Sequence, residues 1–296
     1  MLEIKKLKVV YGKETALNIQ SPIKIESGER IGIIGSNGAG KTTMINALLN
    51  LVPYTGNVKM NFSTEQIGVH QQNNNYTDNL SIAQVIYTVT GAKYNADQRL
   101  TELVDYFKFK DSLRKKFKHL SGGQKQRLTL IMVLYQDKEL VFFDEVTSGL
   151  DYETRQQLVE LLSTWYRDKQ TTICYVSHYY EELEQLADKI LLLEKGEIVC
   201  FGDKRKLFEK YCGKGIYILN KNEKSLELFK DFKTLAAPEH LLVISSNDIE
   251  TDKEIVKRLI AENLNYKYSN NDIEIMSFNA LTKFKAQKNY TEQEVK

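Results

Sequence analysis

The segment "GSNGAGKT", which runs from Gly35 to Thr42, constrains the fold of this chain more than any other part of the sequence. It fits the pattern G-x-x-x-x-G-K-[ST], in which closely spaced glycines let backbone N–H groups turn inward toward a phosphate. The strand-like "RIGIIG" precedes the segment and the helical pattern "TTMINALL" follows it. Because the N-terminus of that helix would point at the anion, the sequence predicts a strand–loop–helix unit that binds a nucleotide.

The last two residues of this segment carry the polar groups that a bound triphosphate needs. Lys41 is long enough to reach the β- and γ-phosphates, and the hydroxyl of Thr42 is suited to bind Mg²⁺. A glycine-rich turn that merely precedes a lysine is the alternative interpretation. It leaves the strand before the segment and the helix after it unexplained.

A second apolar run, "LVFFDE" from Leu140 to Glu145, ends in two adjacent acids. Charges at the end of a buried strand are costly unless they have a partner or a task. Asp144 is placed to hold Mg²⁺ through water, as the corresponding acid of P-loop enzymes does, and Glu145 is placed to polarise an attacking water. Alternatively, both acids simply mark the end of the strand at the solvent.

The run "TTICYVSH" is also strand-like and ends at His178, with the helical pattern of residues 152–167 before it. A helix between two buried strands is the crossover that a parallel sheet requires. His178 would then lie at the same edge as the acids, where we predict that it hydrogen-bonds the γ-phosphate and steadies Glu145. A solvent-exposed strand end is the alternative for a lone histidine.

Two further motifs, "LSGGQ" at 120–124 and "SGLD" at 148–151, complete a set whose order is informative. Together with "GSNGAGKT", "LVFFDE" and His178, they resemble the ATP-binding subunits of ABC (ATP-binding cassette) transporters over roughly the first two thirds of the chain. The resemblance implies an α/β fold of the P-loop NTPase class. It would be an ABC-type cassette with a mixed-sheet core, a β-subdomain and a helical subdomain, which binds and hydrolyses ATP with Mg²⁺.

In that family ATP is sandwiched between two subunits, so the resemblance divides the site between two chains. One chain would supply the phosphate-binding loop, the acids and the histidine, and its partner would supply the signature "LSGGQ". The signature residues expected to face the γ-phosphate of the partner's ATP are Ser121, Gly122, Gly123 and Gln124. Asp151 is the expected D-loop residue. A glycine-rich helix cap is the alternative for "SGGQ" taken alone.

The resemblance also adds an aromatic residue and a glutamine. Tyr11 matches the side chain that stacks on adenine, although an ordinary strand-end tyrosine is the alternative in a chain with 17 tyrosines. The Q-loop offers Gln71 and Gln72 in tandem, of which Gln72 is the preferred residue and Gln71 stays open. The predicted nucleotide-binding set is Tyr11, Gly35, Ser36, Asn37, Gly38, Ala39, Gly40, Lys41, Thr42 and Thr43. The predicted catalytic set is Gln72, Glu145 and His178, and the predicted metal set is Thr42, Gln72 and Asp144.

A change in composition near residues 204–214 predicts a domain boundary. We place the cassette at residues 1–213, with its helical subdomain at about 73–135, and a small accessory α+β domain at residues 214–296. Strand-like and helical runs alternate in the accessory domain, and "NDIEIM" at 271–276 is expected to be a strand. The domain faintly resembles the extension of type-2 exporter ATPases. This favours export of a drug, lipid, polysaccharide or peptide over uptake, and a peptide or another antimicrobial is the preferred cargo.

Nowhere do about 18 apolar residues follow one another, so we expect no membrane-spanning segment in this chain. The resemblance therefore implies a separate transmembrane permease, a cytoplasmic location at the inner face of the cell membrane, and pairing with a second copy or with a sister ATP-binding subunit. The formal net charge of +2 implies no nucleic-acid partner. Cys174, Cys200 and Cys212 form no CxxC pair and are expected to be buried or idle thiols in a reducing cytosol.

Three other functions compete with transport. DNA-repair members of the family carry long coiled coils and translation-associated members carry two cassettes, whereas this chain has neither sustained heptads nor an internal repeat. A nucleotide-gated regulatory module would not need Glu145 and His178, and an ATPase assay would separate it from a transport subunit. A small-molecule kinase does not account for "LSGGQ".

Overall fold

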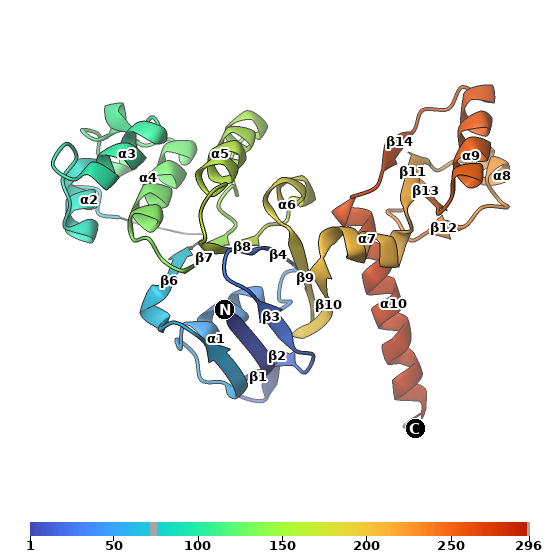
Figure 1. Ribbon diagram of the computed structural model, residues 1–296, viewed down its shortest axis with the longest axis horizontal. Coiled ribbons are helices and arrows are strands. Elements are labelled where there is room, and N and C mark those ends of the chain that lie inside the picture. The colour runs from blue at the N-terminus through green and yellow to red at the C-terminus, as the bar shows by residue number, and fades with distance from the viewer. Residues whose placement is uncertain (72–75, 295–296) are drawn as a thin grey trace.

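The computed structural model describes residues 1–71 and 76–294, and it arranges them around three β-sheets (Figure 1). The largest sheet of these residues has the strand order β10-β9-β4-β8-β7-β6. Its strands are β4 (Arg30–Ile34), β6 (Ile67–His70), β7 (Leu140–Asp144), β8 (Thr172–Val176), β9 (Lys189–Glu194) and β10 (Glu197–Asp203). Every neighbouring pair is parallel except the β9–β10 hairpin, so the predicted mixed-sheet core of an α/β fold is confirmed.

The parallel strands place the sequence motifs at one edge of this sheet. β4 leads into the glycine-rich loop and then into α1 (Lys41–Leu48), β7 ends at Asp144, and β8 ends shortly before His178. α5 (Tyr152–Trp165) is the expected crossover between β7 and β8, and α6 (Tyr180–Leu186) follows β8. Because β8 pairs with both β4 and β7, the loop, the acids and the histidine arise from three adjacent strand ends.

A second sheet, which is antiparallel, packs with α1 against the six-stranded sheet. Its strands are β1 (Leu2–Tyr11), β2 (Glu14–Ile19), β3 (Ile23–Ile25) and β5 (Thr55–Met60). Leu7 and Val9 of β1 share a buried cluster with Met44 of α1 and Phe142 of β7. This packing fixes β1 against the core, and the strand ends at Tyr11 beside the nucleotide loop.

The helical region lies between β6 and β7 in the sequence, and Figure 1 shows it beyond the β6 edge of the large sheet. Its helices are α2 (Ile82–Thr90), α3 (Gln98–Tyr106) and α4 (Gly122–Tyr135). α2 and α4 each begin with a capping box, in which the hydroxyl of Ser81 or Ser121 accepts a bond from the backbone N–H three residues later. No helix of the described residues is both long enough and apolar enough to cross a bilayer.

The third sheet belongs to the C-terminal part of the chain and has the order β12-β13-β11-β14, with antiparallel neighbours. Its strands are β11 (Gly215–Asn220), β12 (Thr234–Leu235), β13 (Leu241–Ser246) and β14 (Lys267–Ser269). The helices of this part are α7 (Lys204–Cys212), α8 (Glu223–Leu228), α9 (Ile249–Ala261) and α10 (Ile273–Glu294). Ile255 and Leu259 of α9 pack on Tyr217 and Ile244 of the sheet, whereas α7 and α10 join the large core of the cassette.

The expected strand at 271–276 is wrong, because most of these residues form the start of α10. Asp272 accepts a hydrogen bond from the N–H of Ile275 at 2.9 Å, in the manner of a helix cap. Ile273, Ile275 and Met276 are all buried in the core that also contains residues of α7. The alternation of Ile273 and Ile275 imitates the period of a strand. Only packing against α7, which the short pattern does not reveal, distinguishes the helix.

The three cysteines are buried and free, as expected. Burial raises the pKa of Cys200 and of Cys212 to about 12. These thiols therefore stay protonated and unreactive near neutral pH.

His70, at the end of β6, makes the stability of the fold sensitive to acid. Its side chain is fully buried, and burial lowers its pKa to about 4. The pKa of a histidine in the unfolded chain is about 6.5. The free energy of unfolding therefore has its full value with respect to His70 above pH 6.5, and it falls by about 3 kcal/mol as the pH falls toward 4. We expect His70→Leu to flatten this part of the pH profile, as measured by urea unfolding between pH 7 and pH 4.5. The exposed His240 provides the matched control, and an unchanged profile in His70→Leu would contradict the assignment.

Candidate functional site

A hollow of about 860 Å³ lies at the edge of the large sheet where β4, β7 and β8 end. It gathers residues from β1, β2, the glycine-rich loop, α1, the C-terminal ends of β7 and β8, and the β9–β10 turn. Its lining residues are Tyr11, Glu14, Thr15, Ala16, Asn37, Gly38, Ala39, Gly40, Lys41, Thr42, Thr43, Asp144, Glu145, His178 and Lys195. Gly35 and Ser36 lie just before the lining part of the loop. The structure therefore brings together most of the residues that the sequence predicts.

The glycine-rich loop holds its lysine against its own backbone. Lys41 Nζ donates to the carbonyl oxygen of Gly35 at 2.7 Å and to that of Ser36 at 3.2 Å. Gly40 caps α1 with a φ of 99°, a conformation that residues with a Cβ atom rarely adopt. Burial lowers the pKa of Lys41, and the negative charges of Glu145 and Asp144 oppose that shift. The result is a cation and a helix N-terminus at one wall of the hollow.

The Thr42 hydroxyl and the Asp144 carboxylate lie beside each other, as a magnesium site requires. Thr42 Oγ1 is 3.4 Å from Asp144 Oδ2. Burial, followed by the charge of Glu145, raises the pKa of Asp144, so a bound cation would favour its charged form. Among the described residues there is no cluster of three or more metal-binding side chains. The hydroxyl and carboxylate oxygens of this pair fit a Mg²⁺ ion that receives its other oxygen ligands from phosphate and water.

Glu145 and His178 form a pair across the ends of β7 and β8. His178 Nε2 lies 2.8 Å from Glu145 Oε1. The backbone N–H of Glu145 donates to the carbonyl of Val176 at 2.9 Å, and Glu145 has a φ of 50°, which is uncommon for a residue with a side chain. This backbone turns the carboxylate into the hollow, where His178 orients it. Such a carboxylate can accept a proton from a water in the hollow.

The buried Glu182 of α6, which the sequence analysis missed, connects the residue before His178 to the loop that follows Glu145. Its carboxylate accepts hydrogen bonds from Ser177 Oγ at 2.8 Å and from Thr147 Oγ1 at 2.7 Å. Ser177 precedes His178, and Thr147 follows Glu145 by two positions. Lys195, at the β9–β10 turn, also lines the hollow, and the sequence analysis did not identify it either. Neither residue carries a local motif that distinguishes it from an ordinary helix or hairpin residue.

The signature residues lie outside this hollow. Ser121 caps α4 by accepting a bond from the N–H of Gln124 at 3.3 Å, and Ser121 and Gly122 are exposed. Asp151 caps α5 through the N–H of Thr154 at 2.9 Å. Neither motif is among the residues that line the pocket of its own chain. Gln72, the preferred Q-loop residue, lies outside the described residues.

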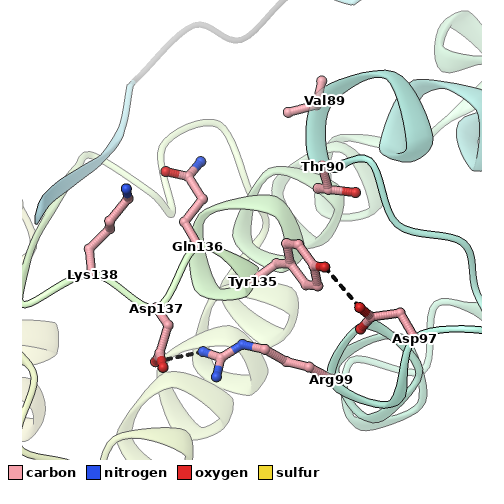
Figure 2. Close-up of a pocket in the computed structure, with 8 residues that line it drawn as sticks. All are labelled: Val89, Thr90, Asp97, Arg99, Tyr135, Gln136, Asp137 and Lys138. Carbon is pink, nitrogen blue, oxygen red and sulfur yellow. Dashed lines mark hydrogen bonds and ion pairs between the residues drawn. The ribbon is translucent and has the colours of Figure 1, made fainter. Parts of the chain in front are cut away.

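A second hollow, of about 460 Å³, lies among the ends of α2, α3 and α4 (Figure 2). Tyr135 donates its hydroxyl to Asp97 at 2.9 Å, and Arg99 forms an ion pair with Asp137 at 2.6 Å. Figure 2 shows both pairs spanning from the start of α3 to the end of α4. These groups fasten the two helices together and present no arrangement of acid, base and phosphate-binding groups.

The family model described as "ABC transporter" matches residues 20–148. The linearmycin resistance ATP-binding protein LnrL of Bacillus subtilis is 29% identical over 230 residues, which cover 72% of each chain. The Nod factor export ATP-binding protein I of Burkholderia orbicola is 31% identical over 218 residues, 69% of this chain and 71% of the relative. The methionine import ATP-binding protein MetN of Corynebacterium efficiens is 32% identical over 204 residues, 63% of this chain and only 57% of the relative.

Solved structures share the fold. An ATP-binding subunit of an ABC transporter gives a TM-score of 0.62 at 22% identity, over 71% of this chain and 93% of that one. A dimeric ATP-binding cassette bound to ADP and Pi gives 0.59 at 23% identity, over 69% and 98%. The motifs, the hollow and the relatives agree. The chain therefore belongs to the ABC transporter family, as an ATP-binding subunit with the ATPase activity of that family.

Proposed function

We propose that this chain powers export across the cytoplasmic membrane through a separate transmembrane permease, and that it works as a pair of ATP-binding subunits. The observation that carries the pairing is the separation of the two halves of the site. The P-loop, Glu145 and His178 line one hollow, whereas exposed signature residues lie outside it on the same chain. A second copy would supply the missing half to each hollow, so two copies of this chain would form two complete sites.

The residues of the hollow have distinct tasks in the proposed reaction. Tyr11, which is 48% exposed, is free to stack on the adenine ring. Lys41 and the N-terminus of α1 would bind the phosphates, and Thr42 and Asp144 would hold Mg²⁺, which neutralises charge on the phosphate oxygens. Glu145 would take the proton of the attacking water while His178 holds its carboxylate in place. The Q-loop glutamine, Gln72, would help to orient the water.

Opening and closing of the pair would couple hydrolysis to transport. ATP would draw each signature toward the partner's phosphate loop, and loss of the γ-phosphate would release it. We propose that the helical region docks the permease on the inner face of the membrane. Exposed apolar residues such as Tyr87 and Val89 of α2 are available for that contact. Residues 214–296 would form the accessory domain of the subunit.

We infer export from the C-terminal extension, because it resembles the extension of type-2 exporter ATPases. The relatives include the Nod factor export protein and a linearmycin resistance protein, but also methionine import proteins. We propose a peptide, an antimicrobial or another drug as the cargo. No nucleic-acid partner is proposed, because the net charge is close to zero.

Deletion of the gene tests the direction of transport. Export predicts that the deleted strain becomes more sensitive to antimicrobial peptides or drugs, and that the wild-type gene, but not a Glu145→Gln copy, restores resistance. Growth inhibition is the measurement, across a panel of such compounds. A strain with unchanged sensitivity that instead requires an added nutrient would point to import and contradict the proposal.

A further inference from the structure

The β9–β10 hairpin supports the phosphate-binding loop from behind. The N–H of Gly196, at the turn, donates to the carbonyl of Ala39 at 3.0 Å. At the start of the loop, a Cβ atom on Gly35 would lie only 2.5 Å from the carbonyl oxygen of Leu193. The loop therefore contacts the hairpin near both ends of the loop, and a displacement of the hairpin would displace the loop.

Glu194, the last residue of β9, links this hairpin to the side chain of the loop. Ser36 Oγ donates to Glu194 Oε2 at 3.2 Å. The carbonyl of the same serine accepts from Lys41 Nζ. Ser36 thus makes a hydrogen bond on each side. Its position sets where one of the two carbonyl oxygens lies that orient the phosphate-binding lysine.

The other oxygen of this carboxylate is bound by the C-terminal helix. Lys285 Nζ of α10 lies 3.4 Å from Glu194 Oε1, and the glutamate side chain is only 12% exposed. One turn further along α10, Lys288 pairs with Glu197 at 2.6 Å. Both lysines bind the same hairpin, but only Lys285 binds a carboxylate that also contacts the phosphate loop. Lys288 is therefore a matched control.

We propose that Glu194 is a positioning residue for the phosphate-binding loop, and that Lys285 makes the C-terminal helix part of the same device. The chain of contacts runs from Lys285 through Glu194 and Ser36 to Lys41. This gives the accessory domain a task at the nucleotide site: it adjusts how well the loop is prepared to bind ATP. The inference rests on the proposed role of the loop in binding ATP.

Glu194 contributes both a hydrogen-bond acceptor and a negative charge. Without the carboxylate, Ser36 loses its acceptor and the loop is less ordered before ATP binds, which weakens binding. Without Lys285, a largely buried anion remains close to a site that must accept a triphosphate. An amide at position 194 keeps the acceptor for Ser36 and removes the charge. It should therefore restore most of the function.

Four variants of the full chain, titrated with ATP and followed by steady-state hydrolysis, test this inference. We expect Glu194→Ala and Lys285→Glu to raise the Kd and KM for ATP by about three- to tenfold, with little change in kcat. Glu194→Gln and Lys288→Glu are expected to stay within about twofold of the wild type. A merely structural role of Glu194 would lower the thermal unfolding midpoint without this split between KM and kcat.

The outcomes separate this inference from the proposed function. Wild-type protein that binds no ATP would remove both. Wild-type protein that binds ATP, together with Lys285→Glu binding ATP as tightly as Lys288→Glu does, would overturn the inference alone. Lys285 is a mostly exposed side chain, so its variants are expected to fold even if Glu194→Ala does not.

Discussion

Glu145→Gln is expected to bind ATP with near wild-type affinity and to hydrolyse it about 10²- to 10⁴-fold more slowly. The substitution keeps the shape of the side chain and an oxygen that can accept from His178 Nε2, which lies 2.8 Å from the carboxylate in the wild type. It removes the basic group that takes a proton from water. Among the described residues, Asp144 is the other acid that lines the hollow at this end of β7, and its contact with Thr42 assigns it to the cation.

Phosphate release at saturating MgATP, together with an ATP titration, measures this effect. The matched control is Glu139→Gln, which makes the same chemical change at the opposite, exposed end of β7. We expect turnover in that control to equal the wild-type rate. Near-normal turnover in Glu145→Gln would remove Glu145 from the mechanism, and loss of ATP binding would show that the residue acts on affinity.

Much of the site could be predicted from the sequence because its parts are local. Lys41 and Thr42 belong to one continuous motif, and Asp144 and Glu145 follow directly from an apolar strand. The parallel sheet then converts three separate strand ends into one edge. The periodicities of the chain were sufficient to predict that sheet, since a helix had to connect β7 to β8.

The rest of the site depends on contacts between distant parts of the chain. Glu194 lies in an ordinary hairpin, and only the packing of that hairpin on the P-loop brings it to Ser36. Lys285 reaches it because α10 packs against α7 and β10, whereas the sequence pattern favours a strand at 271–276. Local sequence patterns carry no information about contacts between such distant residues, so neither periodicity nor motifs predict these contacts.

Ser121→Arg is expected to prevent ATP-driven pairing of two chains while leaving ATP binding by each chain nearly intact. Ser121 is exposed and lies outside the hollow of its own chain, so a larger side chain there has no direct path to bound nucleotide. At an interface, the same change would place a long side chain where the partner's γ-phosphate must approach. It would also remove the hydroxyl that caps α4.

The size of the protein in solution tests most directly whether each chain supplies its signature to the nucleotide bound by the other. In Glu145→Gln protein, where ATP persists, we expect MgATP to shift the chromatographic peak from monomer to dimer. In the double variant Ser121→Arg/Glu145→Gln, we expect ATP to bind with similar affinity and the peak to remain that of a monomer. An undiminished dimer peak in the double variant, or no dimer in Glu145→Gln, would contradict the claim.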